Sequence, residues 1–292
     1  MPESGVRGNR HVQGLDALEL QPRHGTDKSS AAELAGRIWA ATWPKVTAAV
    51  LVLLAWQVLV WSGWRSEFVL PGPDRVLPTL FHEMSTPEFW TAVQVTMRRA
   101  LAGFASALLV GVLIGLAVSQ VKILRDAFGS LITGLQTMPS IVWFPFAMLL
   151  YGINESAIMF VIVLGAAPSV AGGLIAGIDH VNPSLLRAGQ VMGLRGVQRY
   201  TLLIVPAALP MFVTGLKQGW AFAWRSLMAG ELLVIINQQN SIGWALSQAR
   251  QLNDAERLLS YIIVVLCIGT VIDVFFNWAD RALRRRWGVT AP

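Results

Sequence analysis

The chain has 292 residues, of which 54% are hydrophobic and only 14% are charged, and its mean hydropathy is +0.53. Because soluble globular proteins carry about 25% charged residues, this composition excludes an ordinary water-soluble globule and a largely disordered chain, and it indicates a membrane protein with several spans. The net charge of +6 fits basic cytoplasmic loops, and no nucleic-acid-binding motif accompanies it.

Residues 1–36 are polar and aperiodic, which predicts a disordered cytoplasmic tail without the apolar core of a signal peptide. A transmembrane domain is predicted over residues 37–287, followed by a tail at 288–292. Its first span is Val46–Trp61, flanked by tryptophans as expected at both membrane interfaces. Beyond this span, Asp74 is a candidate N-cap for an amphipathic helix that lies along the membrane surface.

The next three spans are predicted at about Ala100–Ser119, Leu131–Tyr151 and Ala157–Ile178, with a short basic loop at 121–129. In the first of them, small residues recur at every fourth position, a spacing that lets helices approach closely in lipid. These small residues are Gly103, Ala107, Gly111 and Gly115.

Prolines interrupt the other two of these spans. Pro139 lies in one and Pro168 in the other, where two glycines follow at 172 and 173. Such breaks are tolerated where neighbouring helices or a water-filled cavity satisfy the freed backbone groups, and transporters often bind substrate at broken helices. Simple kinked packing is the alternative interpretation.

A polar loop at 179–200 separates these spans from the last two. We expect the fifth span at about Leu202–Trp224, a short re-entrant or surface segment at 225–236, a polar loop at 237–257 and the sixth span at about Leu258–Trp278. Most of the 23 Lys and Arg residues then fall on one side, which places both termini in the cytoplasm.

The sequence lacks the motifs of the common enzyme chemistries. It contains no HExxH, no GxSxG, no paired carboxylates in an apolar setting and no phosphate-binding GxxxxGK[ST] loop. The single Cys267 and the scattered histidines show no metal-ligand spacing. We therefore expect no catalytic, cofactor-binding or metal site, and any ATP that drives this protein must be bound by another chain.

The polar loop contains a short predicted helix. Asn182 is a suitable N-cap, Pro183 suits the first turn, and Gly193 lies where helices end. Leu185, Ala188 and Met192 share one face of it. A capped helix with an apolar stripe suits docking into a partner's groove; packing against the protein's own base is the alternative.

The run from Arg187 to Pro206, RAGQVMGLRGVQRYTLLIVP, resembles the signature of binding-protein-dependent ABC importer permeases. That signature is Glu-Ala-Ala, three residues, Gly, nine residues, Ile, any residue, Leu and Pro, and its spacing is kept here with Arg187 in place of the Glu. The segments LPGPDRVLPTL, TMRRALAGF, TMPSIVWFPFAMLLYG and AWRSLMAGELL are similar to permeases for sulfonates, taurine, nitrate and bicarbonate.

The resemblance implies an all-α polytopic membrane protein with about six transmembrane helices and the type I ABC importer permease fold. It also implies a homodimeric pore in the cell membrane, in contact with lipid. Two ATPase subunits would bind the ATP, an extracytoplasmic solute-binding protein would deliver the substrate, and nucleic acid would have no part. The residues that it assigns to ATPase coupling are Pro183, Leu185, Leu186, Arg187, Ala188, Gly189, Met192, Gly193 and Pro206.

Charged residues in or beside the fifth span are candidates for the substrate path, because ionisable groups within a membrane are costly and usually functional. Lys217 and Arg225 fall within one broad helical face and could present positive charge to an anion. The alternative is that Arg225 and Glu231 pair at the outer interface. The further candidates are Pro139 and Pro168, and also Trp220 and Trp224, for which an aromatic belt is the alternative.

The resemblance is nearest to the aliphatic-sulfonate branch, so the expected activity is the passage of small organic sulfonates across the membrane. Taurine, nitrate, bicarbonate or a vitamin precursor is the alternative solute within the family. A self-sufficient secondary transporter is the alternative from another class, although the sequence shows no internal repeat.

Overall fold

The structure is a computed structural model that describes residues 31–234, 236 and 240–286. All the elements in these ranges are helices. Most of the predicted tail 1–36 and all of the tail 288–292 lie outside the described residues. The chain divides into two compact units between residues 55 and 56.

Helix α1 (Ala31–Trp61) makes up the described part of the first unit and runs past its boundary. Its segment Thr42–Trp61 is long and apolar enough to cross a membrane, which confirms the first predicted span. The helix begins before residue 37, the predicted start of the membrane domain. Its apolar side chains from Val46 to Leu54 are exposed, as they would be in contact with lipid.

Helix α2 (Pro73–Met84) confirms the amphipathic segment predicted after the first span. The prediction that Asp74 caps it is wrong. The N-cap is Gly72, and Asp74 lies in the first turn without a capping hydrogen bond. Pro73 takes the first helical position, where a missing N–H costs nothing, and the helix therefore starts before Asp74. The negative charge of Asp74 instead interacts with the positive end of the helix dipole.

Helix α3 (Pro87–Gln120) contains the second predicted span and begins well before it. Thr86 accepts a hydrogen bond from the N–H of Phe89 and so caps the helix there. Phe89 and Ala92 are buried in one cluster with Ile242. This packing explains why the helix extends through a stretch that is too polar to be recognised as part of a span.

The third predicted span is broken, and the basic loop predicted at 121–129 is wrong. Only Val121 interrupts the helices, because α4 (Lys122–Thr137) follows directly. After α4 come a 3₁₀ turn, η2 (Ser140–Trp143), and α5 (Phe144–Tyr151), and the two halves meet at 99°. Met138 is extended before Pro139, as the residue before a proline prefers to be, and the bend follows from this.

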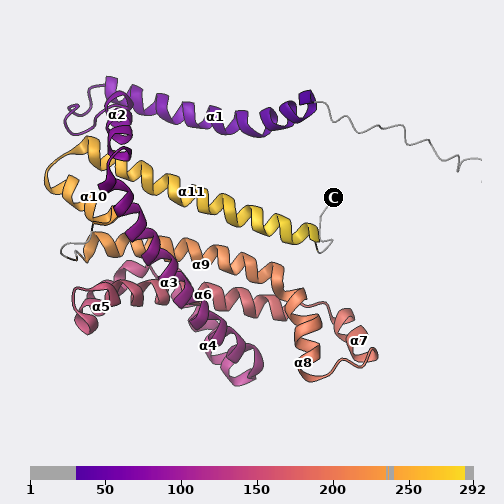
Figure 1. The fold of residues 1–292 in the computed structure, drawn as a ribbon. Helices are drawn as coiled ribbons and strands as arrows, with labels where there is room; N and C mark the ends of the chain where they lie inside the picture. The colour runs from indigo at the N-terminus through magenta and orange to yellow at the C-terminus, as the bar shows by residue number, and fades with distance from the viewer. Residues whose placement is uncertain (1–30, 235, 237–239, 287–292) are drawn as a thin grey trace, which may run out of the picture. The chain divides into compact units, whose positions relative to one another are not determined.

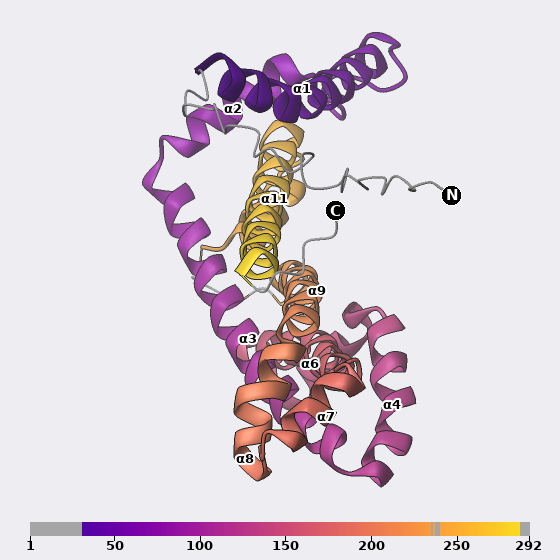
Figure 2. The ribbon, with the colours of Figure 1, turned by 90° about the vertical axis from the view of Figure 1, so that its right-hand side faces the viewer.

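Helix α6 (Glu155–Asp179) confirms the fourth predicted span and contains much of the buried core. The small residues of α3 face it. A Cβ atom on Gly111 would lie 2.7 Å from the carbonyl oxygen of Ala167, and one on Gly103 would lie 2.8 Å from Ile162. The predicted close approach through residues at every fourth position is therefore confirmed. Figure 2 shows α3 and α4 on different sides of α6.

Helix α9 (Val205–Leu233) runs beside α6 (Figure 1). The two backbones touch, because a Cβ atom on Gly173 would lie 2.5 Å from the Cα atom of Gly215. The short segment predicted from residue 225 onward is wrong. The helix continues to Leu233, since Leu227 and Gly230 are buried and keep it packed against the core.

Two further helices follow α9 in the second unit. The predicted polar loop at 237–257 instead contains α10 (Ile242–Gln251), where Ser241 caps the N–H of Trp244. Helix α11 (Ala255–Arg286) contains the sixth predicted span and extends it at both ends. Within the described residues, five helices can cross a membrane, or six if the broken α4–α5 pair is counted as one span.

Gly173→Ala tests the contact between α6 and α9. The new methyl group would meet the Gly215 backbone, so we expect a loss of about 1–3 kcal/mol of stability and a lower midpoint of thermal unfolding in detergent. Gly269→Ala is the matched control, because its Cβ would lie at an ordinary 3.4 Å from Trp224 Nε1. Equal midpoints for the two variants would contradict the tight α6–α9 contact.

Candidate functional site

Helix α7 (Pro183–Val191) confirms the helix predicted in the polar loop. Asn182 Oδ1 accepts a hydrogen bond from the N–H of Ser184 at 2.9 Å, and Pro183 occupies the first turn. Gly193 has a φ of +77°, and the N–H of Leu194 donates to the carbonyl of Gly189 at 2.9 Å. These contacts define both ends of the helix without help from another chain.

One side of α7 packs on the protein and the other is exposed. A Cβ on the buried Gly189 would lie 2.7 Å from Leu203, and Leu186 is half-buried. Leu185 is 48% exposed and Met192 is 70% exposed. Ala188, Arg187 and Val191 are exposed as well. The alternative of packing on the protein's own base therefore holds for one side of α7. Docking into a partner stays a prediction, for which the other side offers exposed apolar residues.

Helix α7 packs against the turn that leads into α9. After α8 (Gly196–Arg199), a turn of π-helix at Tyr200–Ile204 leads into α9, and Pro206 occupies the first turn of α9. Arg125 of α4 pairs with Asp179 of α6 at 2.9 Å. Figure 1 shows α7 and α8 at one end of the α6–α9 pair and α5 and α10 at the other.

The structure does not bring Lys217 and Arg225 together. Lys217 Nζ lies 3.1 Å from Asp273 Oδ1 and donates a hydrogen bond to Asn277 Oδ1 at 2.8 Å. The Arg225 guanidinium lies over the ring of Phe222 at 4.9 Å. Each cation thus has its own partner, and Arg225 does not pair with Glu231.

The two tryptophans of α9 are core residues. Trp220 is 6% exposed and Trp224 is 8% exposed. The Trp220 ring contacts Phe104 of α3 at 5.2 Å and Phe276 of α11 at 6.2 Å, between ring centroids. They contribute to the packing of α9 between two other helices.

A buried group of charges joins α3, α6 and α9 at the end opposite α7. Glu231 is fully buried, and its carboxylate lies 3.1 Å from the Arg99 guanidinium. Arg99 also lies 3.1 Å from Glu155, at the start of α6. Thr96 and the backbone N–H of Gly243 donate to Glu231 at 2.9 and 3.0 Å. Each partner offsets part of the cost of burying this carboxylate.

Sequence reasoning missed Arg99, although a signal was present. A charged residue one position before an apolar run marks a group that must find a partner inside the membrane. Its partner Glu231 was recognised as a candidate, but the two residues lie 132 positions apart. Periodicity within one helix says nothing about contacts at such a separation.

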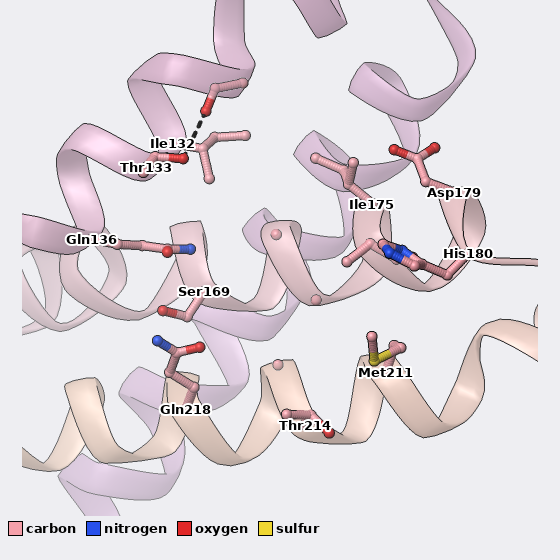
Figure 3. A pocket seen from close by; sticks show the side chains of 15 residues that line it. Ile132, Thr133, Gln136, Ser169, Ile175, Asp179, His180, Met211, Thr214 and Gln218 are labelled. Atoms are coloured by element: carbon pink, nitrogen blue, oxygen red, sulfur yellow. Dashed lines mark hydrogen bonds between the residues drawn. The ribbon is translucent and has the colours of Figure 1, made fainter.

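A pocket of about 470 Å³ lies between α4, α6 and α9, toward the α7 end. Figure 3 shows Gln136 reaching in from α4 and Ser169 and Gln218 approaching each other from α6 and α9. Gln136 Nε2 donates to the carbonyl of Pro168 at 2.9 Å. Pro168 thus bonds to a residue of the pocket without itself lining it. Pro139 lies at the exposed bend between α4 and η2. In the described part of the chain, no group of His, Cys, Asp and Glu could hold a metal ion.

Comparisons with known proteins agree with this architecture. Residues 107–285 match the family described as binding-protein-dependent transport system inner membrane component. A protein of Bacillus subtilis named for aliphatic sulfonate transport is 27% identical over 80% of this chain and 83% of its own length. A nitrate import permease of Synechocystis is 27% identical over 81% of this chain and 87% of its own length. The inward-facing MetNI methionine ABC transporter aligns with a TM-score of 0.57 at 17% identity, over 68% of this chain and 99% of that one.

Arg99→Met tests the buried charges. The change leaves the carboxylate of Glu231 buried without its cation, so we expect a loss of about 3–5 kcal/mol in the free energy of unfolding. Arg75→Met is the control, since Arg75 pairs with Glu67 on the exposed surface, where a salt bridge contributes less than about 1 kcal/mol. Thermal unfolding in detergent compares the two variants, and similar midpoints would contradict a structural role for Arg99.

Proposed function

The chain belongs to the family of binding-protein-dependent transport system inner membrane components, and we propose that it forms the pore of an ATP-driven importer for small organic sulfonates. It is a multi-pass membrane protein and a permease of the type I ABC importer family. The finer parts of this proposal are the solute, the residues that couple the pore to ATP, and the orientation in the membrane.

The proposal that α7 couples the pore to ATP rests on the exposed side of this helix. Leu185, Ala188 and Met192 are exposed on a helix whose two ends are defined by its own residues. A preformed helix loses little conformational entropy when it enters a groove. An exposed apolar face beside the cation of Arg187 fits an apolar groove that carries a carboxylate at its rim.

We infer that this groove belongs to an ATPase subunit. The sequence has no phosphate-binding loop of its own, so ATP must act through a partner that touches this chain. Two ATPase subunits, a second copy of the permease and an extracytoplasmic solute-binding protein complete the proposed assembly. In it, the α7 end and both termini face the cytoplasm, and the α10 end faces the binding protein.

The proposed solute follows from the relatives. One is named for aliphatic sulfonates and another for nitrate, at equal identity. Both solutes are small oxyanions, and the sulfonate is the one that the sequence motifs also favour. ATP-driven uptake of labelled ethanesulfonate into proteoliposomes tests this choice, with nitrate and bicarbonate as competitors. A transporter that takes up nitrate and leaves ethanesulfonate outside would contradict it.

The attraction of an anion by Lys217 and Arg225 stays a prediction. Asp273 neutralises Lys217, and the exposed Arg225 is held over Phe222. The paired Lys217 adds little net charge to the path. The geometry therefore supports a structural role for Lys217 better than contact with the solute.

Met192→Asp tests the docking role of α7. A carboxylate at this apolar position would lie unpaired in the partner's groove, and we expect recovery of the ATPase subunits with the tagged permease to fall at least tenfold, which corresponds to about 1.4 kcal/mol. Leu252→Asp is the control, because Leu252 is 67% exposed and follows α10 at the opposite end. Undiminished recovery with Met192→Asp would contradict docking through this face.

A further inference from the structure

The pocket between α4, α6 and α9 contains a buried hydroxyl group without a partner. Ser169 is 1% exposed, and its Oγ forms no hydrogen bond. A serine in a transmembrane helix can bond to the carbonyl four residues before it, but Ser169 does not use this option. Buried polar groups are usually satisfied, so an exception calls for an explanation such as a ligand. Figure 3 shows Ser169 directed toward Gln218 across the pocket.

Some of the other polar side chains of the pocket use their hydrogen-bond donors within the protein, and others have donors to spare. Thr133 and Thr214 donate to the carbonyls of Gly129 and Pro210 in their own helices, at 3.1 and 3.2 Å. Gln136 gives one N–H to Pro168, and the second N–H of its amide is left over. Three donors thus remain available to a ligand: the hydroxyl of Ser169 and the side-chain amides of Gln136 and Gln218.

A glycine leaves room for the Gln136 amide in the pocket. A Cβ on Gly172 would lie 3.0 Å from Gln136 Nε2, so a larger residue would displace that amide. Gly173 and Gly215 also line the pocket. A volume of about 470 Å³ is in the range of small-molecule sites.

The polar groups of the pocket are mostly neutral. Among the described residues that line it there is no lysine and no arginine. Its carboxylate, Asp179, is paired with Arg125, and His180 Nδ1 lies 2.8 Å from the carbonyl of Ala176. Lys217, next to Gln218 in the chain, forms an ion pair with Asp273. An anion in this pocket would therefore meet neutral donors in place of a cation.

We propose that the pocket is a solute site in which the amide and hydroxyl donors of Gln136, Ser169 and Gln218 hold the oxyanion group of the solute. This inference rests on the proposed function and adds the residues that recognise the solute. A sulfonate has three acceptor oxygens, which matches three donors. Neutral hydrogen bonds are weaker than charged ones, and a transport path needs sites weak enough to release what they bind.

The test uses the complete transporter in proteoliposomes, with its ATPase subunits and binding protein, and measures ATP-driven uptake of ethanesulfonate. Removing one neutral hydrogen bond should lower the rate roughly threefold to tenfold, so we expect this loss for Ser169→Ala and a larger one when Gln218→Ala is added. Thr270→Val should stay near the wild-type rate, because Thr270 of α11 lies outside the pocket and its hydroxyl donates to the carbonyl of Leu266 in its own helix. Ser169→Ala should not lower the unfolding midpoint, since it removes a hydroxyl that has no partner.

A second measurement separates this inference from the proposed function. Thr214→Cys, in a Cys267→Ser background, reports access to the pocket through its rate of maleimide labelling. Ethanesulfonate or nitrate should slow this labelling, and Ser169→Ala with Gln218→Ala should abolish the protection. If the wild type does not take up ethanesulfonate but nitrate protects the cysteine, the proposed solute is wrong and the site stands. Absence of protection by both anions, or wild-type uptake by the double variant, would overturn the site.

Discussion

Helix α6 is packed by α3, α4 and α9 at the same time, and the rest of the unit formed by residues 56–292 depends on how closely these helices approach it. Lipid tails are as apolar as the helices, so burial of apolar surface does not drive them together. Small residues act instead on two sides, where Gly111 meets the Ala167 carbonyl and Gly215 meets Gly173. On a third side, the Gln136 amide bonds to the carbonyl of Pro168.

Two buried polar groups show how differently such groups can serve the molecule. Glu231 is surrounded by Arg99, Thr96 and the N–H of Gly243, and these partners fix α9 against α3 and the start of α10. Ser169 is equally buried but has no partner. A satisfied group contributes structure, whereas an unsatisfied one beside a pocket is available for a ligand.

The sequence predicted the parts of the structure that depend on local chemistry. Apolar runs located the spans, and Asn182 and Gly193 located α7 with its caps. Prediction from the sequence failed where the structure depends on contacts between residues far apart in the chain. Helix α10 lies in a polar stretch and is ordered by packing, and the pairing of Arg99 with Glu231 joins helices far apart in the chain. Lys217 was recognised as unusual within a span, but its neutralisation by Asp273 required the fold.

The contact between α6 and α9 has a mechanical consequence. These two helices flank α7 in the chain, and they touch backbone to backbone at Gly173 and Gly215. A backbone contact has no long side chains to absorb strain, so α6 and α9 would move together if either helix were displaced. Helix α4 forms another wall of the pocket, and the Gln136–Pro168 hydrogen bond and the Arg125–Asp179 pair join it to α6. If a partner displaces α7, as the proposed function requires, that displacement would reach the wall of the pocket that α6 and α9 form.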